Sequence, residues 1–365
     1  MRTGVADLPL HPGRCPKWLF PRMVKLSRAV SKIVVMEYGQ GEFLRRLSNP
    51  FFFQSLGCIV GFDWHSSGLT TTLTGALKEA IVPEEFGMAV LGGKGRASMR
   101  TQQEIETTGE KFSFSEKTVE ELKYSSRMAA KVDSAALQDG YQLYHHVFIV
   151  TEKKKWAVVQ QGMNPASRYA LRYHWLSESI ASMVVEPHAA IASQAVAVSN
   201  VLNMVAKESD ESRKASVDLV KEHPTHLRKF FTHTLYDYLG MPAGHWMNVR
   251  EYERMLAGFN AAYETQPKDY EQLLSIKGVG PKTVRSLALL GKLMFGVDAS
   301  WKDPPVFSWA HGGKDGIPYP VDRKTYDRSV EILNDAIWQA ELGDKEKLGA
   351  LNKLKGLVDS TSDVA

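Results

Sequence analysis

The sequence predicts an α+β protein, with a mixed α/β domain over residues 1–175 and an all-helical domain over residues 176–365. Segments rich in β-branched and aromatic residues, which favour strands, lie in the first half of the chain. From about Leu176 onward, apolar residues recur at the spacing of amphipathic helices, and prolines and glycines separate these segments. Together the two patterns place the domain boundary near residues 170–180.

The N-terminal half is predicted to contain helices and strands. Apolar residues at helical spacing indicate helices over 21–36, 69–81 and 115–138. The short apolar run 88–91 ends in two glycines and predicts a strand, and residues 141–151 and 156–161 flank a polar turn and predict a β-hairpin. In the C-terminal half, helices are expected near 177–206, 209–221, 225–238, 249–264, 269–276, 282–294 and 323–340.

Length and composition narrow the class of protein. A chain of 365 residues with 44% hydrophobic and 24% charged residues is typical of a two-domain globular protein. Cys15 and Cys58 are too few for a disulfide framework or a cysteine zinc site, which favours a reducing compartment. No apolar run approaches the ~20 residues of a membrane span, and the proline-containing N-terminus does not resemble a signal peptide. We therefore expect a cytoplasmic protein with no membrane partner.

The segment Leu274-Ser275-Ile276-Lys277-Gly278-Val279-Gly280-Pro281-Lys282-Thr283-Val284 predicts two helices joined by a glycine turn, a helix–hairpin–helix within residues 269–294. Glycines allow a tight turn and a close approach of the backbone to a ligand. The free amides and the positive dipole end of the second helix favour an anion. We expect a DNA backbone, in double-stranded form, to be bound by Gly278, Val279, Gly280, Lys282 and Thr283. A purely structural helix corner is the alternative.

Residues 276–286 resemble the helix–hairpin–helix of the endonuclease-III-type DNA glycosylase superfamily. Lys282 matches the lysine that attacks the sugar in the bifunctional members, and Asp322 matches their catalytic aspartate. The resemblance implies cleavage of an N-glycosyl bond or of an abasic site by these two residues. Lys282 and Asp322 are 40 residues apart, roughly twice the family's spacing, and Asp298 is the rival carboxylate. A phosphate contact for Lys282 and a helix N-cap for Asp322 are the alternative roles.

Four polar segments of the N-terminal half suggest a second candidate site. Catalytic candidates there are Asp63, His65, Asp139 and His145. Asp133 and Asp139 are candidate ligands for a divalent ion, Mg²⁺ or Mn²⁺, which would stabilise the attacking and leaving oxygens in phosphodiester hydrolysis. On a strand, His145 and His146 point to opposite faces, so at most one of them joins a given site. A hydrogen-bond network that only holds loops together is the alternative.

The turn Gly92-Gly93-Lys94-Gly95-Arg96 predicts a second phosphate contact. Successive backbone amides and cations favour an anion, so we expect Lys94, Arg96 and Arg100 to bind DNA phosphates. The turn is not a nucleotide P-loop, because the Gly-x4-Gly-Lys-Ser/Thr spacing is absent.

Taken end to end, the chain resembles the uncharacterised prokaryotic family described as domain of unknown function 763. The resemblance runs from Arg2–Leu10 through Gly61–Gly68 to His311–Gly316 and implies a shared architecture without an activity. We expect a DNA-processing enzyme that cuts at the N-glycosyl bond or abasic site, as the glycosylase resemblance implies, or in the phosphodiester backbone. One alternative is a metal-dependent nuclease whose active site lies in the N-terminal domain and whose hairpin only binds the DNA. A DNA-binding protein without enzymatic activity is the other. The sequence sets no oligomeric state.

Overall fold

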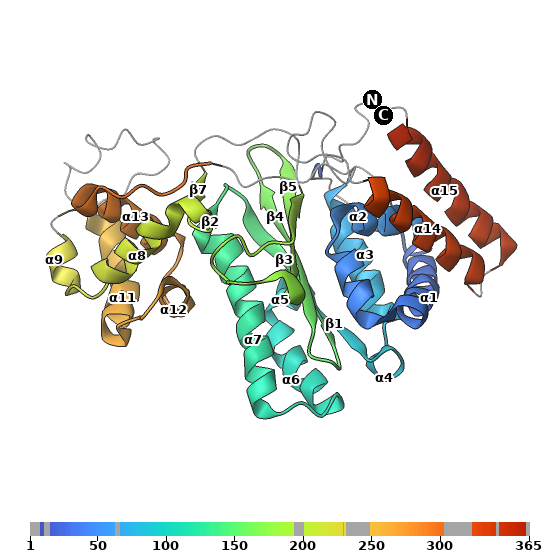
Figure 1. Cartoon of the computed structure of the whole chain (residues 1–365), viewed down its shortest axis with the longest axis horizontal. Helices are drawn as coiled ribbons and strands as arrows, with labels where there is room; N and C mark the ends of the chain where they lie inside the picture. The colour runs from blue at the N-terminus through green and yellow to red at the C-terminus, as the bar shows by residue number, and fades with distance from the viewer. Residues whose placement is uncertain are drawn as a thin grey trace.

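The structure is a computed structural model that describes residues 8–10, 15–62, 66–192, 201–228, 230, 249–302, 323–340 and 343–362. The protein is α+β: helices cover both faces of a five-stranded antiparallel sheet (Figure 1). The strand order is β1-β3-β4-β5-β6. The strands are β1 (Met88–Lys94), β3 (Gln142–Thr151), β4 (Trp156–Asn164), β5 (Tyr169–Leu176) and β6 (Ala190–Ala192).

Helices from both ends of the chain cover one face of the sheet. They are α1 (Phe20–Leu47), α2 (Pro50–Ile59), α3 (Ser67–Ala80), α4 (Pro83–Phe86), α14 (Arg323–Gln339) and α15 (Asp344–Ser362). Leu333 and Ile337 of α14 and Leu354 of α15 share a buried core with the first three helices. In Figure 1 the red α14 and α15 accordingly lie beside the blue α1 and α2. The last two helices therefore pack with the N-terminal half of the chain.

On the opposite face, α5 (Arg96–Met99), α6 (Thr101–Lys111) and α7 (Glu116–Lys131) contact the sheet. The remaining helices lie beyond α7 (Figure 1): α8 (Asp210–Leu219), α9 (Pro224–Arg228), α11 (Val249–Thr265), α12 (Tyr270–Ser275) and α13 (Pro281–Phe295). A π-helical turn, η1 (Val132–Ala136), leads from α7 into β2 (Leu137–Gln138), which pairs with β7 (Leu202–Asn203). One continuous buried core runs from Trp175 on the sheet through Leu137 to Leu273 and Leu287.

The predicted strand at 88–91 and the predicted hairpin are confirmed as β1 and as β3–β4. The helix expected over 177–206 is wrong. The described residues of this segment form one 3-10 turn, η2 (Ser177–Ser179), together with β6 and β7, and a second 3-10 turn, η3 (Lys207–Ser209), follows the segment. Pro187 has no N–H to donate and disfavours helical backbone at Glu186, whose φ is 43°.

Within the described ranges, no helix combines the length and the apolar content that crossing a bilayer requires.

Candidate functional site

The turn between α12 and α13 has the geometry of the predicted hairpin. Asp269 caps α12 by accepting the Gln272 amide at 2.7 Å. Gly278 has a φ of 96°, and the backbone of Gly258 on α11 lies directly against it. A Cβ on Gly258 would stand 2.5 Å from the Gly278 carbonyl oxygen. Glycine at both positions therefore allows two backbones to touch, which fixes the hairpin on α11.

The outer side of the hairpin is open. Lys277, Gly278 and Lys282 are exposed, and a Cβ on Gly280 would have no atom within 4 Å. The N-cap residue of α13 is Gly280, which has no side chain to cap the helix, and Pro281 follows at its first position. The side chains of Val279 and Thr283 are buried, at 0% and 1% exposure, so only their backbone could face a ligand.

The carboxylates expected near Lys282 do not meet it in the described structure. Asp322 lies outside the described residues. Asp298 pairs with Lys292, with Nζ and Oδ1 2.5 Å apart, and follows the C-terminal end of α13. Lys282 lies in the first turn of that helix, so the two are roughly 20 Å apart at a rise of 1.5 Å per residue. Asp298 is therefore no partner for the Lys282 amine.

Three side chains anchor the inner side of the hairpin on the sheet domain. Lys131 Nζ donates to the Ile276 carbonyl at 3.1 Å, and Gln138 Nε2 donates to the Pro281 carbonyl at 2.8 Å. Tyr124 on α7 donates its hydroxyl hydrogen to Glu271 on α12 at 2.8 Å. Burial lowers the pKa of Lys131. The hairpin therefore sits on α7 and η1 through polar contacts as well as through the shared core.

Asp133 lies on η1 and is fully buried. Three N–H donors surround its carboxylate: His188 Nε2 is 2.5 Å from Oδ1, while Gln160 Nε2 at 2.5 Å and Trp175 Nε1 at 2.9 Å donate to Oδ2. Short π-helical turns are frequent at functional sites because they displace a side chain from the regular helical pattern. Here the turn places Asp133 over the sheet, facing β4 and β5.

The contacts of Asp133 continue into a longer buried network. Gln160 Oε1 is 2.7 Å from His146 Nδ1, and His146 Nε2 is 2.9 Å from Ser126 Oγ. Burial lowers the pKa of His146. Asp139 accepts the Tyr173 hydroxyl at 2.6 Å, and burial raises the pKa of Tyr173 well above its usual range.

The structure therefore brings Asp133 and Asp139 to the same face of the sheet, each bound by protein donors. Among the described residues, no group of three or more His, Cys, Asp or Glu side chains could hold a metal ion. Asp63 and His65, the other candidates of the N-terminal half, lie outside the described residues.

His145 lies on the other face of the sheet, as the alternation of β3 predicts. It pairs in register with Gln161, which in turn pairs with Arg172, so one polar row crosses three strands beneath α2 and α3. His145 Nε2 is 3.0 Å from Thr74 Oγ1, and Arg172 contacts Gln54 at 3.1 Å. Burial lowers the pKa of His145 to about 3, with smaller effects of His146 and Lys94. His145 is thus separated by the sheet from Asp133 and Asp139.

The glycine turn after β1 is occupied by groups of the protein itself. Glu104 Oε2 accepts the Gly92 amide at 2.7 Å and the Lys78 ammonium at 2.7 Å. The Gly95 amide donates to the Tyr144 carbonyl at 2.8 Å. These contacts use amides that the sequence analysis assigns to a phosphate. The cations predicted there remain exposed: Lys94, Arg96 and Arg100.

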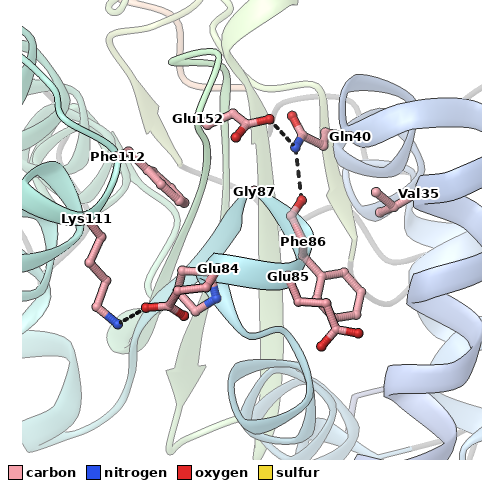
Figure 2. Close-up of a pocket in the computed structure, with 10 residues that line it drawn as sticks. Val35, Gln40, Glu84, Glu85, Phe86, Gly87, Lys111, Phe112 and Glu152 are labelled. Atoms are coloured by element: carbon pink, nitrogen blue, oxygen red, sulfur yellow. Dashed lines mark hydrogen bonds and ion pairs between the residues drawn. The ribbon is translucent and has the colours of Figure 1, made fainter.

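A pocket of about 470 Å³ lies at the end of the sheet where β1 begins and β3 ends. Figure 2 shows Glu84 pointing to Lys111, and Gln40 between Glu152 and the Phe86 carbonyl. Glu85 adds a third carboxylate to the lining. Carboxylates repel phosphate, and the pocket lies at the far end of β3 from His145, so we do not place nucleic acid there.

His188 is absent from the candidates of the sequence analysis. It follows Pro187 in a segment expected to be helical, and no motif connects it with Asp133, 55 residues earlier. A proline inside a predicted helix, followed by a histidine, is the signal that could have marked this segment as a loop.

The chain matches the family model described as "Protein of unknown function (DUF763)" over residues 4–321. The chain belongs to this family. The match includes the sheet, the Asp133–His188 pair and the hairpin, and it ends immediately before α14. No curated protein and no solved structure matches the chain.

Proposed function

We propose that this protein binds the sugar–phosphate backbone of duplex DNA through the hairpin Ile276–Lys282 and cleaves the bound DNA. The observation that carries the proposal is the open N-terminus of α13. Its amides lack a side-chain cap, Gly280 leaves space in front of them, and Lys277 and Lys282 are exposed beside them.

Physical chemistry favours a phosphate at this place. The first amides of a helix and its dipole attract an anion, and the two lysines add mobile positive charge. Contacts to the backbone of a nucleic acid do not depend on its sequence, because every nucleotide carries the same phosphate. The rigid attachment of the hairpin to α11 and η1 supports binding without a loss of loop entropy.

The exposure of Lys282 helps to decide whether this lysine attacks a sugar or contacts a phosphate. A lysine that attacks a sugar needs a desolvated or cation-flanked amine, whereas a lysine that contacts phosphate needs only to be reachable. The exposed side chain of Lys282 favours the phosphate contact. A glycosylase or lyase reaction through Lys282 and Asp322 is the second candidate function, supported by the resemblance of residues 276–286.

Binding is tested by fluorescence anisotropy with a short labelled duplex and the full chain, at several salt concentrations. The logarithm of the affinity should fall linearly with the logarithm of the salt concentration. Gly280→Glu places a carboxylate in open space on extended backbone, so the chain folds and binding should weaken on the order of 10-fold or more. Gly349→Glu, on the exposed surface of α15, is the matched control and should bind like the wild type.

Two results would overturn the binding proposal: an affinity independent of salt, or a Gly280→Glu variant that binds as tightly as the wild type. The cleavage routes separate in a second assay. Borohydride reduction with abasic DNA traps a covalent adduct if Lys282 forms a Schiff base, and Lys282→Gln removes it. Loss of cutting in EDTA would instead indicate hydrolysis that depends on a divalent ion.

A further inference from the structure

The contact between His188 and Asp133 has the geometry of an oriented base. His188 Nε2 lies 2.5 Å from Asp133 Oδ1, and the side chains are 7% and 0% exposed. An ionised carboxylate can only accept, and Asp133 already accepts from Gln160 and Trp175 at its other oxygen. The hydrogen in the contact therefore belongs to Nε2 of His188, which leaves a lone pair on Nδ1.

The second ring nitrogen takes no part in this contact. No described residue forms a hydrogen bond with His188 Nδ1, and 7% of the His188 side chain is exposed. The rings of Trp175 and Tyr173 hold the imidazole from two sides, with centroids 4.7 and 5.9 Å away. The imidazole is thus fixed by packing and by a carboxylate, with its free nitrogen directed away from that carboxylate.

A second imidazole in the same network is unsuited to act on a substrate. His146 forms hydrogen bonds at both ring nitrogens, with Gln160 and Ser126, and Ser126 is 1% exposed. A macromolecular substrate cannot reach it. Within this network, His188 combines an oriented ring with a second nitrogen that forms no hydrogen bond with a described residue.

One short segment connects the pair with the hairpin. Asp133 lies between Lys131, which donates to the Ile276 carbonyl, and Gln138, which donates to the Pro281 carbonyl. The residues that hold the hairpin and the residue that orients His188 therefore belong to one turn, η1 and its flanks. The turn that carries Asp133 therefore also fixes the position of the hairpin that is proposed to hold the DNA.

We propose that His188, oriented by Asp133, is the general base that deprotonates the water attacking a phosphodiester bond of DNA held at the hairpin. This inference rests on the proposed function. The water oxygen bonds to phosphorus, its proton passes to His188 Nδ1, and the bond from phosphorus to the departing sugar oxygen breaks. That oxygen takes a proton from solvent and His188 returns its proton to solvent, which yields a phosphomonoester and an alcohol. Asp133 is a positioning residue in this scheme.

The test compares His188→Gln with His223→Gln in the full chain, in anisotropy and in cleavage of labelled duplex DNA. Glutamine keeps an N–H donor near the position of Nε2, so Asp133 remains hydrogen-bonded, but it offers no basic nitrogen. Loss of a general base typically costs 10²–10⁴-fold, so we expect His188→Gln to cleave about 100-fold more slowly or worse. Its DNA affinity should equal that of the wild type. His223 is exposed beside α9, and its substitution should change neither quantity.

Asp133→Asn should lower kcat and leave KM unchanged, because the carboxylate acts through His188 rather than on the DNA. Imidazole added to His188→Ala should restore part of the cleavage rate, which it would not do for a residue needed only for packing. If these variants do not fold, the ¹⁵N shifts of His188 in the wild-type protein provide the test. They should show a hydrogen on Nε2 and a bare Nδ1, and the opposite tautomer would overturn the inference.

The outcomes distinguish this inference from the proposed function. If the wild type binds and cuts DNA and His188→Gln cuts equally fast, the base assignment is wrong and the proposed function stands. If the wild type binds DNA but cuts neither intact nor abasic duplexes, the base assignment is wrong and only the binding part stands. If the wild type does not bind DNA, the proposed function fails, and a base acting on DNA fails with it.

Discussion

The hairpin and the Asp133–His188 pair are two regions of contrasting construction that meet at one turn. The hairpin presents backbone amides and lysines on an open surface, and its residues are neighbours in the chain. The pair is buried, with side chains that are 7% and 0% exposed, and its two residues are 55 positions apart. A surface site of the first kind changes affinity when it is altered, whereas a buried polar site of the second kind changes stability. Substitutions can therefore test whether the two regions have separate tasks.

The largest effect is expected from removal of the buried carboxylate. Asp133→Ala leaves the N–H groups of His188, Gln160 and Trp175 without an acceptor in the core. Such a loss should lower the free energy of unfolding by about 3–5 kcal/mol. Urea unfolding followed by circular dichroism measures it, with Lys153→Ala, in the exposed β3–β4 turn, as the surface control that should unfold like the wild type. Equal midpoints for Asp133→Ala and the wild type would contradict the buried network.

The second-largest effect on stability is expected at Gly278 of the hairpin and not at Gly280. Gly278 has a φ of 96° and touches the Gly258 backbone, so Gly278→Val combines backbone strain with a steric conflict. Strain alone typically costs 1–3 kcal/mol, so we expect a loss of about 2–3 kcal/mol in the free energy of unfolding. Gly280→Val has extended backbone and open space, and it should unfold like the wild type. Similar losses in both variants would mean that the packing of Gly278 on α11 is not what fixes the turn.

The third effect is a pH dependence confined to the sheet. Burial lowers the pKa of His145 to about 3, whereas the unfolded chain titrates near 6.5. Below about pH 6.5 the unfolded state binds more protons, so the free energy of unfolding should fall by about 1.4 kcal/mol per pH unit. His145→Gln removes this titration and should make the slope shallower by that amount. Urea midpoints measured from neutral to mildly acid pH test it, and an unchanged slope in the variant would contradict the burial of a neutral imidazole.

The same contrast explains how much the sequence could predict. The hairpin was predictable because glycines, a proline and a lysine within seven residues determine its backbone and its charge. The β3–β4 hairpin was predictable because β-branched residues flank a polar turn. His188 was not, because its role depends on Asp133, and only the sheet and the π-helical turn bring the two together.

Two further differences between the sequence-based expectations and the structure also arise from long-range packing. Helices α14 and α15 pack against α1 and α2 through their apolar faces. An amphipathic pattern in the sequence predicts such a face but not the element it packs against. From the glycine turn after β1 the sequence predicts a phosphate contact, whereas the Gly92 amide donates to the carboxylate of Glu104, from the next helix but one. A local pattern does not show which partner the fold brings to a position.

The smallest effect concerns a single surface charge and sharpens the contrast most. If Lys282 neutralises one phosphate, Lys282→Gln should reduce the slope of log affinity against log salt by about 0.9. Lys153→Gln removes the same charge from the exposed β3–β4 turn, at the other end of the sheet, and should leave the slope unchanged. A global charge effect would reduce the slope in both variants alike, whereas a covalent role for Lys282 would abolish trapped adducts and leave the slope intact. Only a contact between Lys282 and the DNA backbone lowers the salt slope in Lys282→Gln and not in Lys153→Gln. Neither substitution should change the stability of the protein.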